Sequence, residues 1–226
     1  MDGLNLTDLR ILTVIETHAW MLCREFFIDP GCCIPATRAL LRVFKHYGIE
    51  AKPLAVKVII HNSKLRAALE ENTLPPEITT ALKTGMFHPH STMTPSECVN
   101  WLRARAMQPV VLGSAQTARG SYATHAAHLV AFLPKHSILI DPTIAQANRP
   151  ERQIEMPVIV AQINDPRFFA GEVIWRCEVN GCSVEYRGFP QERGYLKSTS
   201  WTDSKRTWPL ARALTTIIDG SNVQRH

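Results

Sequence analysis

The dipeptide Asn180-Gly181 separates two runs of alternating apolar residues, "EVIWRCEV" and "CSVEYRGF". Asn-Gly readily adopts the left-handed backbone of a tight turn, so this pattern is typical of a β-hairpin. A second pair of apolar runs, "HLVAFLP" and "HSILIDPT", is separated at Pro134-Lys135 and predicts another hairpin. Together with the run "PVIVAQI", these segments predict that the second half of the chain is mainly antiparallel sheet.

The first half of the chain has helical periodicity instead. Apolar residues recur at helical spacing over 6–27 and again over 33–47, where Gly48 provides a stop signal. The segments "SKLRAALEEN", "PPEITTALKTG" and "TPSECVNWLRARAM" predict three shorter helices, and "WPLARALTTIIDG" predicts a final one. Strands are expected in "AKPLAVKVII" and "PVVLG". Helices in one half and antiparallel strands in the other predict an α+β fold.

Composition limits the compartment and the partners. The net charge is +5 and the pI is about 9.0, but lysine and arginine are scattered, which favours a solvated basic surface over a nucleic-acid partner. No apolar run is long enough to span a bilayer, and the N-terminus lacks the features of a signal peptide. Six irregularly spaced cysteines do not form a disulfide framework. We therefore expect a cytoplasmic protein with reduced thiols, of unknown oligomeric state.

Two adjacent cysteines, Cys32 and Cys33, follow the break at 29–31 and precede the helix predicted over 33–47. A helix N-terminus stabilises a thiolate through its unpaired N–H groups and its dipole, and the same groups can hold an oxyanion. The alternative is that these residues are small buried side chains, as we expect for Cys23 and Cys98. A nucleophilic cysteine also needs a base and a group that orients the base.

The hairpin predicted over 128–143 offers both groups. His128 begins its first strand and Asp141 ends its second, so antiparallel pairing about Pro134-Lys135 brings the two residues together. A histidine with a neighbouring carboxylate is the arrangement that activates a cysteine in Cys-His-Asp enzymes. A core or surface histidine remains the alternative for His128 taken alone.

These segments resemble the transglutaminase-like cysteine enzymes, which share the papain-like fold. The stretch "CCIPATRALLRVFKHYGIEAKPLAV" is similar to the nucleophile helix of that superfamily and its following strand, and "HLVAFL…ILIDPT" is similar to its histidine and aspartate strands. The order Cys, His, Asp also agrees. The family's nucleophile lies about four helical turns before a Gly-Ile pair, and counting back from Gly48 reaches Cys33 rather than Cys32.

The resemblance implies Cys33 as nucleophile, His128 as base and Asp141 as orienting group. It implies one transglutaminase-like domain over 1–226, with a mainly helical insertion at about 61–120. The expected activity is hydrolysis of an amide or peptide bond through a thioester, without a metal or cofactor. Transfer of the acyl group to an amine, by a transglutaminase or an N-acyltransferase, is an alternative. A binding protein that keeps the fold without turnover is another.

Other residues could also form sites. His125 could replace His128 as base, although its odd offset on a strand places it on the opposite face. His88 and His90 could bind metal, but no cysteine or carboxylate is near them in the sequence. Cys177 and Cys182 flank Asn180-Gly181 and could form a disulfide or half of a metal site. We expect structural roles for all of these residues.

Overall fold

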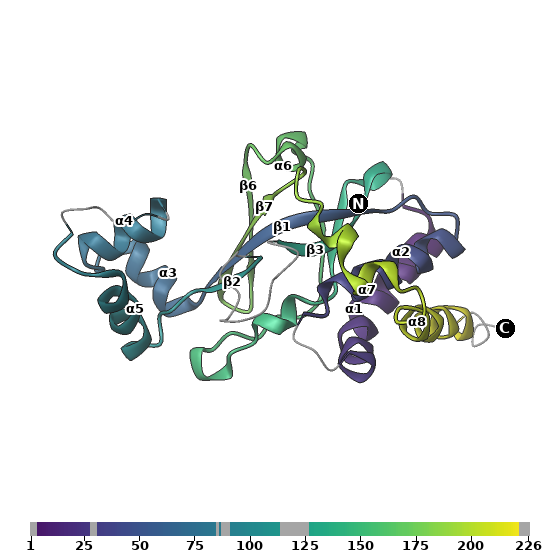
Figure 1. Ribbon diagram of the computed structural model, residues 1–226, viewed down its shortest axis with the longest axis horizontal. Coiled ribbons are helices and arrows are strands. Elements are labelled where there is room, and N and C mark those ends of the chain that lie inside the picture. The colour runs from purple at the N-terminus through teal and green to yellow at the C-terminus, as the bar shows by residue number, and fades with distance from the viewer. Residues whose placement is uncertain (1–3, 28–30, 85, 87–90, 114–126, 222–226) are drawn as a thin grey trace.

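The computed structural model describes residues 4–27, 31–84, 86, 91–113 and 127–221. These residues form an α+β fold, as the sequence predicts (Figure 1). The helices are α1 (Leu6–Phe26), α2 (Cys33–His46), α3 (Ser63–Glu70), α4 (Pro76–Thr84), α5 (Pro95–Ala104), α6 (Pro166–Ala170), α7 (Thr199–Thr202) and α8 (Trp208–Gly220). The strands are β1 (Lys52–His61), β2 (Val110–Leu112), β3 (His128–Leu133), β4 (Ile138–Asp141), β5 (Ile159–Gln162), β6 (Ile174–Val179) and β7 (Cys182–Gly188).

The seven strands described form one antiparallel sheet in the order β5-β4-β3-β1-β7-β6, with β2 also paired to β1. Two strands share one edge of β1. β3 pairs with its first half, where Val56 lies opposite His128, and β2 pairs with its second half, where Ile60 lies opposite Val110. The end of β2 and the start of β3 therefore meet beside the middle of β1.

Both predicted hairpins are present. Asn180 and Gly181 have φ values of 49° and 75°, which is the left-handed pair that a two-residue turn between β6 and β7 requires. β3 and β4 also pair as predicted, but their connection is longer than a two-residue turn at Pro134-Lys135. It is a 3-10 turn over Pro134–His136, followed by Ser137 with φ 53°.

The two faces of the sheet bury different clusters. Ala131 and Ile140 point to the face covered by α1, α2 and α8, where Leu40, Phe44 and Leu214 complete the core. Residues of the opposite parity pack together on the other face, including Val58, Val130, Leu139, Val184 and Tyr186. The period-2 alternation of each strand thus serves two cores.

Helices α3, α4 and α5 form a subdomain between β1 and β2, and they lie away from the other helices (Figure 1). They bury a separate apolar cluster that includes Leu65, Ile78, Cys98 and Leu102. The side chain of Asn62 caps α3 and donates to the carbonyl oxygens of Ala106 and Arg152 at 2.6 and 2.8 Å. This one buried amide ties the base of the subdomain to the body of the protein.

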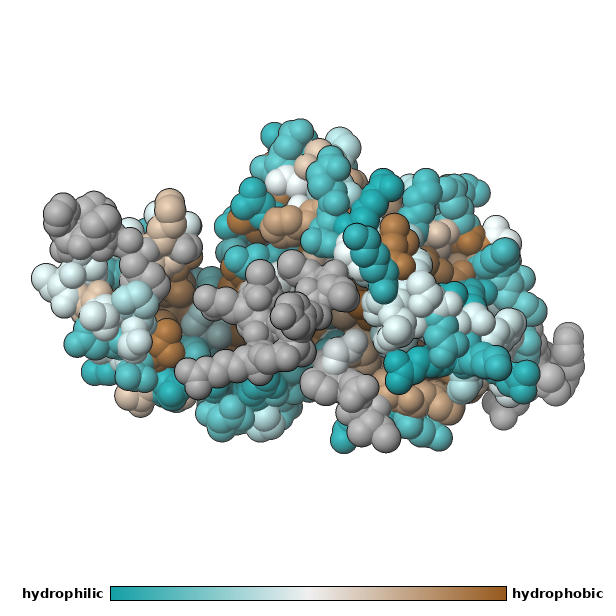
Figure 2. Space-filling view, in the orientation of Figure 1, coloured by the Kyte–Doolittle hydropathy of each residue, from teal (hydrophilic) through white to brown (hydrophobic). Residues whose placement is uncertain are grey.

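On the face shown in Figure 2, hydrophilic residues predominate among the coloured residues, and hydrophobic residues show as separate patches. Within the described parts of the chain, no helix combines the length and the apolar character that crossing a bilayer requires.

Candidate active site

His128 and Asp141 are in direct contact. The Nε2 atom of His128 lies 2.9 Å from each carboxylate oxygen of Asp141, and both side chains are buried, with exposed fractions of 3% and 0%. The backbone N–H of Thr143 donates to Oδ1 of Asp141 at 3.1 Å, which fixes the carboxylate at the end of β4. The sequence predicted this proximity from the hairpin.

The register of the hairpin explains the contact. Ala131 pairs with Ile140, so continuing the register by one residue places Asp141 opposite Val130. His128 is two residues before Val130, and therefore projects from the same face as a diagonal neighbour of Asp141. His128 begins β3 and Asp141 ends β4, so both lie at one end of the hairpin, where the sheet gives way to loops.

Cys33 lies at the same end of the sheet. It is the first residue of α2, and α2 packs on β3 through Thr37, whose hydroxyl donates to the carbonyl oxygen of Leu129 at 2.8 Å. The thiol of Cys33 is close enough to the side chain of His128 to contribute to its raised pKa. Because Nε2 of the imidazole already bonds Asp141, Nδ1 is the ring nitrogen left for the thiol.

The environment of Cys33 is partly apolar. The thiol is half-buried and packs against a small cluster formed by Ala55, Ala127, Leu129 and Tyr195. The ring of Trp201 stands edge-on to that of Tyr195, with 4.8 Å between their centroids, and packs on the same cluster. Side chains from segments distant in sequence therefore pack around one partly exposed sulfur.

The two adjacent thiols, those of Cys32 and Cys33, lie in different environments. Cys32 is the N-cap residue of α2 and is 5% exposed. Burial, and then the neighbouring charge of Cys33, raise the pKa of Cys32 to about 12, which keeps this thiol protonated. Of the two thiols, Cys33 is the one that contributes to the raised pKa of His128.

Opposing effects act on the pKa of His128. Burial acts to lower it, whereas the charge and hydrogen bonds of Asp141, and then the contact with Cys33, act to raise it. The net result is a pKa of about 10, well above the ordinary value, because two carboxylate oxygens lie at 2.9 Å. The imidazole is therefore held as a cation near neutral pH, and a neighbouring thiolate would balance that charge.

The start of α2 provides hydrogen-bond donors beside the sulfur. The first N–H groups of a helix have no intrahelical acceptor, and here the N-cap residue Cys32 contributes no side-chain cap. Pro35 has no N–H, which leaves the amides of Cys33 and Ile34 as the donors of the first turn. These donors can stabilise an oxyanion that forms after attack by Cys33.

Tyr186 is a further member of this cluster. Its hydroxyl donates to Oδ2 of Asp141 at 3.0 Å, and the residue is fully buried. Burial, followed by the charge of Asp141, raises the pKa of Tyr186 well above its ordinary value, so the hydroxyl stays protonated and remains a donor. Asp141 thus accepts hydrogen bonds from Tyr186, His128 and the amide of Thr143.

No protein-family model, curated protein or solved structure matches this chain. The geometry of the cluster formed by Cys33, His128, Asp141 and Tyr186 is therefore the basis for any assignment of function.

Gly113 brings a second segment against the backbone of His128. It follows β2 and has a φ of 76°. A Cβ atom at this position would lie 2.3 Å from the backbone nitrogen of His128 and 2.7 Å from the carbonyl oxygen of Val56. Only glycine permits this approach, which closes the space between the end of β2 and the start of β3.

The structure describes only some of the other candidate site residues from the sequence analysis. His88, His90 and His125 lie outside the described residues. Cys177 and Cys182 are free thiols: Cys182 pairs with Val179 in the hairpin and Cys177 with Val184, so the two are not opposite one another and the disulfide alternative is wrong. Within the described parts of the chain, no three His, Cys, Asp or Glu side chains gather as metal ligands would.

Sequence reasoning missed Tyr186 and Gly113. The alternation in "CSVEYRGF" places Tyr186 on one face with Cys182 and Val184, and all three are buried. That signal indicates an inward-facing tyrosine, whose hydroxyl needs a partner. It does not indicate which partner, because the approach of β7 to β4 depends on the curvature of the whole sheet.

Proposed function

We propose that this protein is a cysteine-dependent acyl-transfer enzyme with a transglutaminase-like, papain-like core, and that it hydrolyses an amide or peptide bond. Cys33 is the nucleophile, His128 the general acid and base, and Asp141 the orienting carboxylate. The observation that carries the proposal is the buried pair of His128 and Asp141, with Nε2 2.9 Å from both oxygens. The thiol of Cys33 contributes to the raised pKa of the same imidazole, which supports its role as nucleophile. Isolated core histidines do not need this arrangement.

The reaction begins with attack by the Cys33 thiolate on the carbonyl carbon of the amide. A C–S bond forms, and the amides at the start of α2 stabilise the oxyanion. The C–N bond then breaks as the His128 imidazolium gives its proton to the leaving amine, which leaves a thioester on Cys33. Asp141 stabilises the imidazolium and holds the ring in the orientation that the transfer requires.

Hydrolysis completes the cycle. The neutral imidazole of His128 accepts a proton from water as the water attacks the thioester carbonyl, and the C–S bond breaks to release the acid. The same thioester passes to an amine in a transglutaminase or an N-acyltransferase, which is the second candidate function. The partial exposure of Cys33 supports hydrolysis as the first choice, because water reaches an open site more readily than an amine at low concentration.

The six cysteines are all free, which fits a protein that works in the reducing cytoplasm. The expected substrate is a peptide or another amide-containing molecule. We propose that the subdomain of α3, α4 and α5 is the expected insertion and that it contributes to substrate selection.

The test is covalent capture of an acyl group, measured by intact-protein mass spectrometry after brief incubation with p-nitrophenyl acetate at neutral pH. We expect a rapid single adduct on wild-type protein, and hydroxylamine, which cleaves thioesters, should remove it. Cys33→Ala should lose the adduct. Cys32→Ala is the matched control, since it removes a neighbouring thiol from the same helix start, and it should keep the adduct.

Two results would contradict the assignment. An adduct that survives in Cys33→Ala and disappears in Cys32→Ala would move the nucleophile by one residue. The absence of any rapid adduct, together with the absence of turnover of peptide amides, would overturn the enzyme and leave the binding protein as the better explanation. Formation of hydroxamate or amide from an added amine, in excess of hydrolysis, would favour the transferase.

A further inference from the structure

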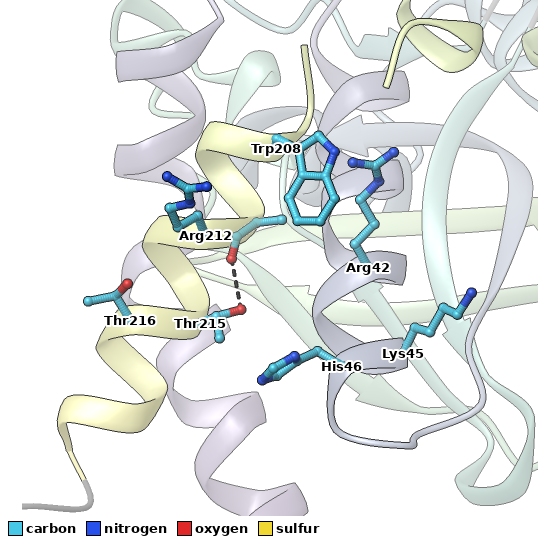
Figure 3. A pocket seen from close by; sticks show the side chains of 8 residues that line it. Arg42, Lys45, His46, Trp208, Arg212, Thr215 and Thr216 are labelled. Carbon is cyan, nitrogen blue, oxygen red and sulfur yellow. Dashed lines mark hydrogen bonds between the residues drawn. The ribbon is translucent and has the colours of Figure 1, made fainter. Parts of the chain in front are cut away.

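A cavity lies between α2 and α8, away from the candidate active site. Its volume is about 610 Å³. The residues that line it are Arg42, Lys45 and His46 from α2, and Trp208, Ala211, Arg212, Thr215 and Thr216 from α8 (Figure 3). Arg42 is nine residues after Cys33 on the same helix, so the cavity begins about 14 Å along α2 from the nucleophile.

The charge of this cavity is positive and uncompensated within its lining. Arg42, Lys45 and Arg212 carry permanent charges, and none of the described residues that line the cavity is Asp or Glu. The nearby carboxylate of Asp219 accepts a hydrogen bond from the Tyr47 hydroxyl at 2.7 Å and is not part of the lining. The lining therefore offers an anion three cationic side chains and no competing carboxylate.

Arg42 has a further cation beside it, Arg38, which is not part of the lining. Burial of its guanidinium, and then the positive charge of Arg38, lower the pKa of Arg42 from its ordinary value. Among the described residues, the guanidinium of Arg42 donates one hydrogen bond, to the carbonyl oxygen of Ser204 at 3.2 Å. This acceptor is neutral. An anion in the cavity would supply the opposite charge that this guanidinium lacks.

The side chain of Trp208 forms part of the cavity lining. An indole in this position indicates that an anion bound here also carries an aromatic ring. The indole is 55% exposed, which is unusual for a tryptophan, and the guanidinium of Arg42 lies 4.8 Å from its ring centre (Figure 3). In Figure 2, hydrophilic residues and residues of intermediate hydropathy dominate the rest of the face over α7 and α8. A flat, partly exposed indole beside cations is the combination that stacks a base and binds its phosphates.

We propose that the cavity between α2 and α8 binds a nucleoside phosphate, with the base on Trp208 and the phosphates among Arg42, Lys45 and Arg212. The hydroxyl of Thr216 offers a further polar contact. The volume lies within the range of small-molecule sites, roughly 300 to 1,000 Å³. An inorganic phosphate would use the cations but leave the indole exposed. The proposal is independent of the acyl-transfer activity, because the cavity shares no lining residue with the Cys33 cluster.

The test is isothermal titration calorimetry with three probes: ATP, inorganic tripolyphosphate and adenosine. Since stacking strengthens binding of each base, ATP should bind about tenfold more tightly than tripolyphosphate, and adenosine should bind more weakly than either. Trp208→Ala should reduce the affinity for ATP to that for tripolyphosphate and leave tripolyphosphate binding unchanged. Cys33→Ala should bind ATP like the wild type.

Charge reversal tests the cations. Lys45→Glu and Arg212→Glu should each weaken ATP and tripolyphosphate by tenfold or more. Lys64→Glu is the matched control, because it makes the same change of net charge at an exposed position of α3, and it should not alter binding. Thermal melting identifies any variant that does not fold, in which case Lys45→Gln and Arg212→Gln replace it, with a smaller expected loss.

Three outcomes would overturn the proposal. One is the absence of ATP binding at millimolar concentration. Another is equal affinity for tripolyphosphate and ATP in the wild type, which would leave only a general anion site. The third is unchanged ATP binding in both charge-reversal variants, which would place the nucleotide elsewhere on the protein.

Discussion

The hydroxyl of Tyr186 and the carboxylate of Asp141 lie 3.0 Å apart, although two strands, β3 and β1, separate β7 from β4 in the sheet. In a flat sheet, strands three steps apart are about 14 Å from each other, which exceeds the reach of a tyrosine. The sheet must therefore curl until β7 faces β4. This hydrogen bond closes the curl over the candidate site, and it supplies one of the three donors to Asp141.

Tyr186→Phe tests Tyr186 as a positioning residue. The change removes one donor from a buried carboxylate, so we expect a loss of about 1 to 2 kcal/mol in the free energy of unfolding and about tenfold in turnover. Tyr47→Phe is the matched control, because it loses a comparable bond to Asp219 far from the site and should keep full turnover. The NMR resonance of the imidazole N–H should move in the first variant alone. Equal effects of the two changes on turnover would show that Tyr186 is only structural.

Asp141→Asn tests the orienting carboxylate. Asparagine keeps one oxygen to accept from Thr143 and His128, and Tyr186 can turn its hydroxyl to accept from the new amide, so the fold should hold. Turnover should fall by about 10³ to 10⁴, since the imidazolium loses its negative partner. Circular dichroism checks the fold and a chromogenic ester assay measures the rate. Wild-type turnover in this variant would remove Asp141 from the mechanism.

The pH dependence of stability tests the pair of His128 and Asp141. The pKa of His128 in the folded protein, about 10, is above its ordinary value of 6.5. The pair therefore stabilises the fold fully below about pH 6.5, and this contribution is lost as the pH rises through about 10. The difference in unfolding free energy between wild type and His128→Gln should shrink by a few kcal/mol between pH 7 and pH 10.5. Urea titrations across this range measure it, and a constant difference would contradict the raised pKa.

Alkylation tests the environment of the six thiols. Burial raises the pKa of Cys23, Cys32, Cys98, Cys177 and Cys182, to about 12 for Cys32 and about 11 for Cys177. Cys33 combines partial exposure with a position close enough to His128 to contribute to the raised pKa of that histidine. Iodoacetamide near neutral pH should therefore modify Cys33 at least tenfold faster than the others. Peptide mapping over time measures the rates, and equal labelling of Cys33 and Cys177 would be evidence against an activated thiol.

Gly113→Ala tests the close approach to His128. Gly113 and Gly181 have nearly equal φ values, 76° and 75°, but a Cβ atom meets the backbone of His128 at Gly113 and nothing within 4 Å at Gly181. Gly181→Ala should therefore cost only the strain of a left-handed backbone, about 1 to 2 kcal/mol. Gly113→Ala should cost at least about 2 kcal/mol more and reduce turnover per folded molecule. Similar losses in both variants would show that the segment at Gly113 moves freely.

The parts of the fold that the sequence predicted are those with local signals. Asn180-Gly181 specifies its own turn, and the capping box of Thr94 and Glu97 starts α5 where the sequence indicates. The short helices α6 and α7 were not predicted. A helix of four or five residues cannot show a full period of apolar residues, and it depends on tertiary contacts for its stability.

The candidate site, like the fold, was predictable only where its residues are close in the sequence. His128 and Asp141 are joined by one hairpin, so sequence spacing was sufficient to bring them together. The contact of Cys33 with His128 depends on how α2 packs on β3, and for this step the family resemblance took the place of a physical signal. Tyr186 and Gly113 reach the site from distant segments, and no local pattern encodes the curl of the sheet or the meeting of β2 with β3.

The pairing of Ile60 with Val110 places the exit and the return of the helical subdomain at adjacent points of the sheet. Whatever chain lies between these two residues, β1 keeps the same register on β3, and it is this register that sets the position of His128. The segment can therefore be lengthened, shortened or exchanged during evolution while the Cys33 cluster remains unchanged. In such an architecture, the helical subdomain can diversify much faster than the pair of His128 and Asp141.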